Sequence, residues 1–128
     1  MKMNVVDSSG WLEYFAEAKN ADFFAPAIEN TNHLIVPSIS ILEVFKHVLR
    51  HRSEKEAFES IECMLQGTLV DLSIELSLNA AKLGVQHKLP LADSIIYATG
   101  LAHQATVWSQ DADFEGLPNV KYIQNKQE

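Results

Sequence analysis

Short apolar runs rich in β-branched residues alternate along the chain with longer segments of helical periodicity. The apolar runs lie at residues 5–6, 34–36, 69–70, 106–108 and 120–123. The helical segments lie at 41–49, 58–65, 74–85 and 95–102, with weaker patterns at 11–18 and 22–28. Strands that are apolar throughout are typical of a parallel sheet covered on both faces. The alternation therefore predicts a three-layer α/β/α fold with a central, mostly parallel sheet of about five strands.

The spacing of apolar residues also predicts which helix faces are buried. These faces comprise Ile41, Phe45, Val48 and Leu49, then Phe58, Ile61 and Leu65, and then Ile74, Leu78, Ala81 and Val85. The segment 95–102 is apolar on almost every side, which indicates a helix enclosed by the rest of the fold. The 128 residues contain no repeat, low-complexity tract or linker-like stretch, so we expect residues 1–128 to form one domain.

Composition limits the cellular setting of the chain. The single cysteine, Cys63, excludes an intramolecular disulfide and lies in an apolar stretch, which favours a buried, unreactive thiol. The N-terminal segment becomes polar at Asp7, too early for the apolar region of about 7–15 residues in a signal peptide. No apolar run approaches the roughly 20 residues of a membrane helix, so we expect a cytoplasmic protein with no membrane partner.

Acidic residues stand where predicted strands give way to helices. Asp7 directly follows the first apolar run, and Glu43 comes shortly after the second. Asp93 opens the enclosed helix, and Asp111 closely follows the fourth run with Asp113 just behind it. The carboxyl ends of parallel strands share one edge of the sheet, where such folds place their functional sites. We therefore expect these acids to converge there.

Each acid taken alone also fits a local role at a helix start or a turn. Asp7 fits an N-cap, and Ser40 with Glu43 has the spacing of a capping box. Asp93 fits the first turn of a helix, and Asp111 fits a turn. Capping does not explain why the acids share one edge with few neutralising residues nearby. Clustered carboxylates repel one another and persist only when they are protonated or bridged by cations.

The predicted acid cluster has the ligand chemistry of a magnesium or manganese site. Oxygen ligands without His or Cys favour Mg²⁺ or Mn²⁺ over zinc. One or two such ions suit phosphodiester hydrolysis, in which two ions about 4 Å apart activate water and stabilise the leaving oxygen. The formal net charge of −7 argues against a nucleic-acid partner, but bound metal ions would attract phosphate to the acidic site.

Four segments resemble, in order, the motifs of PIN-domain nucleases, and most closely those of VapC-type toxins from bacterial and archaeal toxin–antitoxin pairs. The segments are VVDSSGW at 5–11, SISILEV at 38–44, LPLADSIIYA at 89–98 and WSQDADF at 108–114. The third segment is the most specific match, and the resemblance extends over nearly the whole chain. The sequence departs from the family in one detail, because Ser109 stands where Thr is more common.

The resemblance implies a PIN-like fold and a role for each matching acid. Asp7 and Asp93 would be the principal metal ligands. Glu43 would bind a metal ion or its water, and Asp111 would complete the site. Because all four acids are present, the resemblance implies catalytic activity.

The resemblance also implies supporting residues and partners. Ser9 and Ser109 would orient the ligands through hydrogen bonds, although each also fits an ordinary surface serine. Asp113 is either a further metal ligand or an acid that serves the turn before Phe114. The family cleaves RNA such as tRNA, rRNA or mRNA, leaves a 5′-phosphate, and is restrained by an antitoxin that covers or invades the acidic pocket. A homodimer is a further family-level expectation.

Four of the ten Lys and Arg residues lie in one ten-residue basic stretch that also holds His47 and His51; they are Lys46, Arg50, Arg52 and Lys55. Lys46, Arg50 and Arg52 are the best candidates for contacts with RNA phosphates, although such runs are usually solvated faces. Glu43, His47 and His51 share one helix stripe, a spacing that zinc ligands can adopt. The surrounding cations oppose a bound metal ion, so this stripe is a weak zinc candidate.

The aromatic residues near the N-terminus have three open interpretations. They are Trp11, Phe15, Phe23 and Phe24. Core packing is the simplest explanation for most of them. A surface that accepts an antitoxin helix and a dimer contact are the alternatives.

The acid set favours a metal-dependent endoribonuclease that acts as the toxin of a toxin–antitoxin pair. The main alternative is a non-catalytic PIN-like module that binds RNA or protein. A structure-specific DNA nuclease is a third possibility, although such an enzyme is expected to carry more basic surface.

Overall fold

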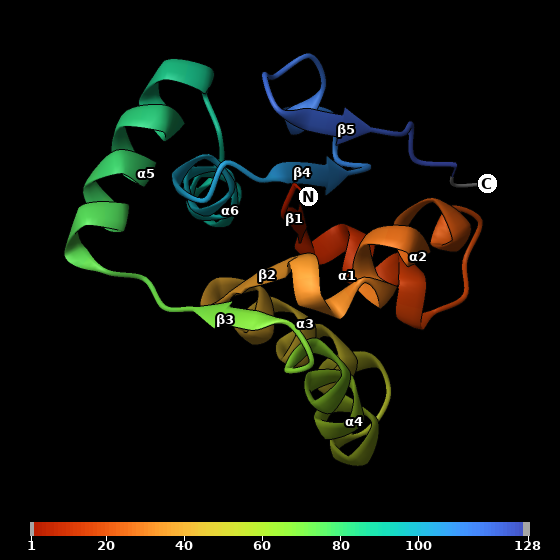
Figure 1. Cartoon of the computed structure of the whole chain (residues 1–128). Coiled ribbons are helices and arrows are strands. Elements are labelled where there is room, and N and C mark those ends of the chain that lie inside the picture. The colour runs from red at the N-terminus through yellow and green to blue at the C-terminus, as the bar shows by residue number, and fades with distance from the viewer. Residues whose placement is uncertain (1, 127–128) are drawn as a thin grey trace.

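In the computed structural model, which describes residues 2–126, five strands and six α-helices alternate along the chain (Figure 1). The strands are β1 (Asn4–Val6), β2 (Leu34–Pro37), β3 (Thr68–Val70), β4 (Thr106–Ser109) and β5 (Val120–Tyr122). The α-helices are α1 (Ser8–Phe15), α2 (Ala21–Glu29), α3 (Ser38–His51), α4 (Glu54–Met64), α5 (Ile74–His87) and α6 (Leu91–Ala102). Two short 3-10 helices are η1 (Thr31–His33) and η2 (Ala112–Phe114).

The strands form one sheet in the order β3-β2-β1-β4-β5, and every neighbouring pair is parallel. In the register of the sheet, Val5 of the central strand β1 pairs with Ile35 on one side and Val107 on the other. The chain adds β2 and β3 on one side of β1 and then crosses over to add β4 and β5. A parallel sheet that reverses its strand order in this way has its crevice at the carboxyl ends of the strands beside the reversal.

Alternate side chains of the central strands point to opposite faces of the sheet, and each face is covered by helices. Val6 and Val36 lie in a core built with α1, α2, α3 and α4. Val5, Ile35 and Val107 lie in a second core with α6. Helices therefore flank the sheet on both sides (Figure 1), which confirms the predicted three-layer α/β/α fold and explains why the strands are apolar throughout.

Helix α6 is the enclosed helix that the sequence predicts. Seven consecutive residues, 94–100, are buried in it. Gly100 lets the helix approach the sheet closely, because a β-carbon there would lie 2.5 Å from Cγ2 of Val107 on β4. Helix α5 then packs on the outside of α6, with Leu76 and Ala80 against Ile95 and Ala98.

The prediction of which face of α5 is buried is wrong. Ile74 and Val85 are 83% and 84% exposed, and Leu78 is exposed as well. The buried face is the opposite one, which contains Leu76 and Ala80. Helix α5 has apolar residues on both faces, so periodicity alone could not say which of the two contacts the protein.

The predictions of the buried faces of α3 and α4 are partly right. Val48 is buried on α3 beside Val44, but Leu49 is exposed. On α4, Phe58 and Leu65 are exposed, whereas the smaller Ala57 and the terminal Met64 are buried.

Cys63 on α4 is half-buried, and desolvation together with the charge of Glu29 raises the pKa of its thiol, which favours the unreactive protonated form. Of the helices within residues 2–126, none combines the length and the apolar character needed to cross a bilayer.

Candidate active site

The acidic residues singled out in the sequence lie at the carboxyl edge of the sheet. Asp7 directly follows the central strand β1, and Asp111 follows its neighbour β4. Asp93 lies in the first turn of α6, and Glu43 lies on α3, the helix that follows β2. Four separate segments of the chain therefore bring their acids to the place where the strand order reverses.

The carboxylate of Asp7 is enclosed, with only 2% of the residue exposed. The Ser109 hydroxyl donates a hydrogen bond to its Oδ2 at 2.7 Å, and the backbone N–H of Gly10 donates to its Oδ1 at 2.9 Å. The Ser9 hydroxyl lies 2.9 and 3.0 Å from the two carboxylate oxygens. These hydrogen bonds favour the ionised form, but burial outweighs them and raises the pKa of Asp7 to about 6.

Asp93 is half-buried and shows the effect of the surrounding charges most clearly. Desolvation and four neighbouring carboxylates raise the pKa of Asp93 to about 7. In decreasing order of effect, these neighbours are Asp111, Asp7, Asp113 and Glu43. The effect of a like charge weakens with distance, so the contribution of all four carboxylates agrees with their convergence at this edge of the sheet.

Three of these acids form a tight group of oxygen atoms. One carboxylate oxygen from each of Asp93, Asp111 and Asp113 lies within 4.8 Å of the other two. Mg²⁺ and Mn²⁺ bind carboxylate oxygens at roughly 2 Å, so the three oxygens could surround one such ion after small side-chain rotations. The donor set contains neither His nor Cys, and its chemistry fits a hard divalent cation. Asp7 and Glu43 lie outside this group.

The two serines expected to orient ligands both contact Asp7. Ser9 does so from the first turn of α1, and Ser109 does so from the end of β4. The Ser109 hydroxyl also accepts a hydrogen bond from the backbone N–H of Asp111 at 2.9 Å. Ser109 therefore connects the acid after β1 to the loop that carries the acid after β4.

A third serine, Ser8, has a contact that the sequence did not indicate. Its hydroxyl donates a hydrogen bond to Oε1 of Glu43 at 2.6 Å and links α1 to α3. The possible capping box of Ser40 and Glu43 is wrong, because α3 begins at Ser38 and Ser40 is buried within it. The Ser8–Glu43 contact spans 35 positions, so no local spacing rule could have revealed it.

Local capping accounts for only part of the acid set. Asp7 is the N-cap of α1, and Asp111 caps η2 by accepting a hydrogen bond from the backbone N–H of Asp113 at 3.0 Å. Asp93 and Glu43 cap nothing, since prolines stand at the N-caps of α6 and α3. Asp7 and Asp111 therefore cap a helix and also lie at the shared edge, whereas helix capping does not explain the positions of Asp93 and Glu43.

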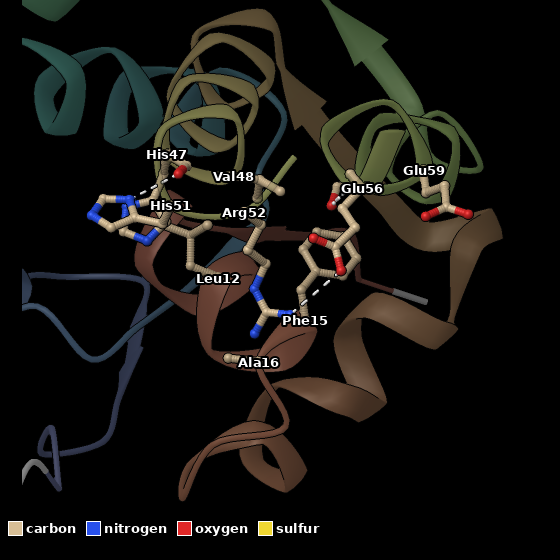
Figure 2. Close-up of a pocket in the computed structure, with 10 residues that line it drawn as sticks. Leu12, Phe15, Ala16, His47, Val48, His51, Arg52, Glu56 and Glu59 are labelled. Atoms are coloured by element: carbon tan, nitrogen blue, oxygen red, sulfur yellow. Dashed lines mark hydrogen bonds and ion pairs between the residues drawn. The ribbon is translucent and has the colours of Figure 1, made fainter. Parts of the chain in front are cut away.

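The basic residues of α3 divide between two hollows. Lys46 and Arg50 line a hollow of about 240 Å³ that also contains Glu43. Arg52, the C-cap of α3, instead lies 3.7 Å from Glu56 on α4 (Figure 2). Lys46 and Arg50 therefore continue the surface of the acidic site, and Arg52 does not.

The histidines of the same helix do not form a zinc site. The rings of His47 and His51 stack at 4.2 Å, and the His51 Nδ1 is hydrogen-bonded to the carbonyl of His47. Burial, His51 and Arg50 together lower the pKa of His47. Within residues 2–126, neither histidine belongs to a group of metal-binding side chains close enough to share an ion.

A larger cavity of about 550 Å³ lies between α1, α3 and α4 (Figure 2). Its apolar lining residues are Leu12, Phe15, Ala16 and Val48, and its polar lining residues are His47, His51, Arg52, Glu56, Glu59 and Ser60. Of the N-terminal aromatic residues, Trp11 and Phe24 are fully buried in the core, and Phe15 lines this cavity. Core packing therefore explains Trp11 and Phe24, and Phe15 also takes part in a surface.

Comparison with known structures gives several matches to this fold. A toxin–antitoxin complex from Klebsiella pneumoniae has 21% identity and a TM-score of 0.76, with 92% of this chain and 95% of that chain covered. VapBC2 from Rickettsia felis, bound to a promoter DNA fragment, has 13% identity and a TM-score of 0.72, covering 95% and 98%. VapC20 from Mycobacterium tuberculosis, a toxin that cleaves the sarcin-ricin loop, has 14% identity and a TM-score of 0.71, covering 87% and 92%.

At these identities the structural matches establish the fold alone. No curated protein matches the sequence. A family model, that of the PIN domain, matches residues 5–119. This range includes all five acids of the site, which are Asp7, Glu43, Asp93, Asp111 and Asp113. The match spans far more than half of the 128 residues, and it agrees with the parallel five-stranded sheet. The chain therefore belongs to the PIN domain family.

Proposed function

We propose that this PIN domain is a metal-dependent endoribonuclease and the toxin of a toxin–antitoxin pair. The observation that carries the proposal is the convergence of four other carboxylates on Asp93, where desolvation and these neighbouring charges together raise its pKa to about 7. Such a group is unfavourable without a cation, and a fold gains nothing in stability from keeping it. The similar chain from Mycobacterium tuberculosis is a toxin that cleaves the sarcin-ricin loop, which supports RNA as the substrate class.

The site residues divide into those that would hold a metal ion and those that hold these ligands in place. Asp93, Asp111 and Asp113 would bind the ion directly, with Asp7 beside them. Glu43, held by Ser8, would bind a second ion or a metal-bound water. One or two Mg²⁺ or Mn²⁺ ions, held by these residues, would supply charge stabilisation and an activated water for phosphodiester hydrolysis that leaves a 5′-phosphate on the product.

Lys46 and Arg50 are the proposed contacts for the RNA backbone. Both side chains are exposed on α3 and share a hollow with Glu43, so a strand whose phosphate lies at the acids can continue over them. Phosphate contacts of this kind position the strand without reading its sequence. Arg52 is directed toward Glu56 and is a weaker candidate than the sequence alone suggested.

Replacing Asp93 with Asn tests the proposed activity. The purified Asp93→Asn and Asp7→Asn variants should fold and should lose metal-dependent cleavage of RNA, because each loses a charged oxygen ligand. The matched control is Asp71→Asn, which removes an exposed acid that follows β3 and has no proposed role. The measurement is cleavage of RNA and of single-stranded DNA with Mg²⁺ or Mn²⁺. Full activity in Asp93→Asn, or cleavage of DNA alone, would refute the assignment.

The metal-free protein should become less stable as the pH rises from about 4 to about 7. Asp7 and Asp93 have folded-state pKa values of about 6 and about 7, above the ordinary value of 3.8. The folded state therefore binds more protons than the unfolded chain in this range, and the free energy of unfolding falls as these protons are lost.

Urea unfolding in a chelator, measured across this pH range, tests the expectation. Asp93→Asn should show a shallower decline and should be more stable than wild type near neutral pH. Mg²⁺ or Mn²⁺ should raise the melting temperature of wild type, and more so at higher pH, because the ligands must be ionised. A non-catalytic module without a metal site would show no metal effect, and unfolding free energy that rises with pH would contradict the electrostatic account.

We further propose that the cavity between α1, α3 and α4 accepts the antitoxin. The Klebsiella pneumoniae match is a toxin–antitoxin complex, which supports a protein partner for this fold. The cavity has an apolar floor that includes Leu12, Phe15 and Val48, and a rim with charges of both signs. An amphipathic helix with an apolar stripe and charged edges has the complementary chemistry (Figure 2).

Phe15→Glu should weaken antitoxin binding at least tenfold, because it places a charge on the apolar floor. The partner to test is the product of any small gene encoding a DNA-binding protein immediately beside this one. Co-purification and titration calorimetry would measure the effect, and Leu65→Glu, which changes an exposed residue outside the cavity, is the control. Equal affinity of Phe15→Glu and wild type would rule out this cavity.

The exposed face of α5 supports the expected homodimer. Ile74, Leu78, Ala81 and Val85 form an apolar stripe on the side of α5 that faces away from α6. The residues are spaced four, three and four apart, so the pattern reads the same in both directions. A second copy of α5 packed antiparallel would therefore place Ile74 opposite Val85 and Leu78 opposite Ala81.

Charges beside this stripe agree with the same arrangement. Glu75 and Lys82 are both exposed on one edge of it. In an antiparallel pair of α5 helices, that edge meets the same edge of the partner, so each Glu75 comes near the other copy's Lys82. The stripe and its charges are thus self-complementary, as a twofold interface requires.

Light scattering should give the mass of two chains for wild type and of one chain for Ile74→Glu combined with Val85→Glu. That combination places two acids opposite each other at both ends of the interface. Ile74→Glu combined with Val85→Lys should restore the dimer, because it places opposite charges there. A wild-type protein with the mass of a single chain would contradict the proposal, as would equal masses for the two combinations.

A further inference from the structure

A separate pocket of about 410 Å³ adjoins the acidic site on the side of β5. We call it the β5 pocket. It is lined by Ser9, Gln110, Asp111, Ala112, Tyr122, Gln124 and Asn125. These residues come from the start of α1, the loop after β4, and the end of β5 with the segment that follows it.

The β5 pocket shares two of its lining residues with the acidic site. Ser9 donates its hydroxyl hydrogen bond to the carboxylate of Asp7. Asp111 contributes one of the three clustered carboxylate oxygens. A molecule that fills this pocket therefore lies directly beside a phosphate group held at the acids.

The lining chemistry favours a neutral, planar, hydrogen-bonding group over a second phosphate. None of the seven lining residues is Lys or Arg. Tyr122 offers an aromatic ring, and Gln124 and Asn125 offer side-chain amides that can both donate and accept. Aromatic stacking together with polar contacts to the base edge is how proteins bind unpaired nucleobases.

The walls of the pocket are held in place by a buried hydrogen-bond network. The Asn20 side-chain amide, 1% exposed, donates to Oε1 of Gln110 at 2.9 Å and to the backbone carbonyl of Gln124 at 3.0 Å. Gln110 donates in turn to Glu13 at 3.1 Å. The network attaches the segment after β5 to the loop after β4, while the parallel register sets Tyr122 beside Ser109.

The groups that would contact a base are not used by the fold itself. Within the part of the chain that the structure describes, the Tyr122 hydroxyl and the side-chain amides of Gln124 and Asn125 have no hydrogen-bond partner. Gln124 and Asn125 are exposed, and Tyr122 is half-buried. The wall is therefore held through backbone atoms and through Asn20, while the side chains remain available to a ligand.

We propose that the β5 pocket binds an unpaired nucleobase of the nucleotide next to the scissile phosphate. Tyr122 stacks on the base, and Gln124 with Asn125 contacts its edge. The proposal rests on the proposed ribonuclease function for the identity of the substrate, but binding of a base can be measured without cleavage. The proposal implies that the RNA is cut in a single-stranded or looped region, because a paired base cannot enter the pocket.

The first experiment measures base binding in the absence of metal. The probes are adenosine, guanosine, cytidine and uridine, with ribose as the control that lacks a base. At least one nucleoside should shift the backbone amide signals of residues 109–112 and 122–125 in NMR spectra, and ribose should not. Tyr122→Leu should weaken this binding at least about fivefold, because stacking is lost, and Tyr122→Phe should retain it.

The second experiment measures cleavage of an RNA substrate by the same variants. Tyr122→Leu should raise KM with little change in kcat, Tyr122→Phe should behave as wild type, and Gln124→Ala should alter the preference among bases at the cleavage site. Phe58→Leu, which changes an exposed aromatic residue on α4, is the matched control. Circular dichroism establishes that each variant is folded.

The outcomes separate this proposal from the proposed function. Nucleoside binding that Tyr122→Leu leaves unchanged, or the absence of any shift in the pocket, overturns the base pocket even if RNA is cleaved. Nucleoside binding that depends on Tyr122, in a wild-type protein that cleaves no RNA with Mg²⁺ or Mn²⁺, supports the pocket and refutes the nuclease.

Discussion

The parallel pairing of β1 with both β2 and β4 is the constraint on which the rest of the structure depends. It places the ends of the strands at one edge, so Asp7 and Asp111 lie beside each other although more than a hundred residues separate them. Helix α6 packs closely on this sheet through Gly100 and brings Asp93 to the same edge. The acidic site is therefore a consequence of strand direction and of one close helix–sheet contact.

The same edge holds two carboxylates in surroundings that disfavour their charge. Asp7 is buried although its charge favours water, and Asp93 is surrounded by four carboxylates. Hydrogen bonds from serine hydroxyls offset part of this cost at Asp7 and hold the carboxylate in one orientation. Packing and hydrogen bonds, rather than positively charged side chains, hold these carboxylates in fixed positions. A divalent metal site requires ligands that are fixed in this way.

Besides the acidic site, the surface carries three features that a self-contained fold does not need. The cavity between α1, α3 and α4 suits an amphipathic helix, the outer stripe of α5 is complementary to itself, and the β5 pocket offers a ring and free amides beside the acids. They share no residue, so the proposed antitoxin, second copy and RNA strand would each contact a separate set of residues. The acidic centre and the β5 pocket share Ser9 and Asp111, which would couple the proposed base binding to the position of the phosphate.

The sequence by itself determined the three-layer fold, the parallel sheet and the location of the acids at strand ends, because these follow from local patterns that the chain repeats. Tertiary structure alone decided which face of α5 is buried, that Ser8 holds Glu43, that Arg52 is directed toward Glu56, and that Tyr122 lies beside Asp111. A helix that is apolar on both faces carries no local signal for which face is inside. Contacts such as Ser8–Glu43 join residues whose separation is set by the packing of whole elements, so no spacing in the sequence could have revealed them.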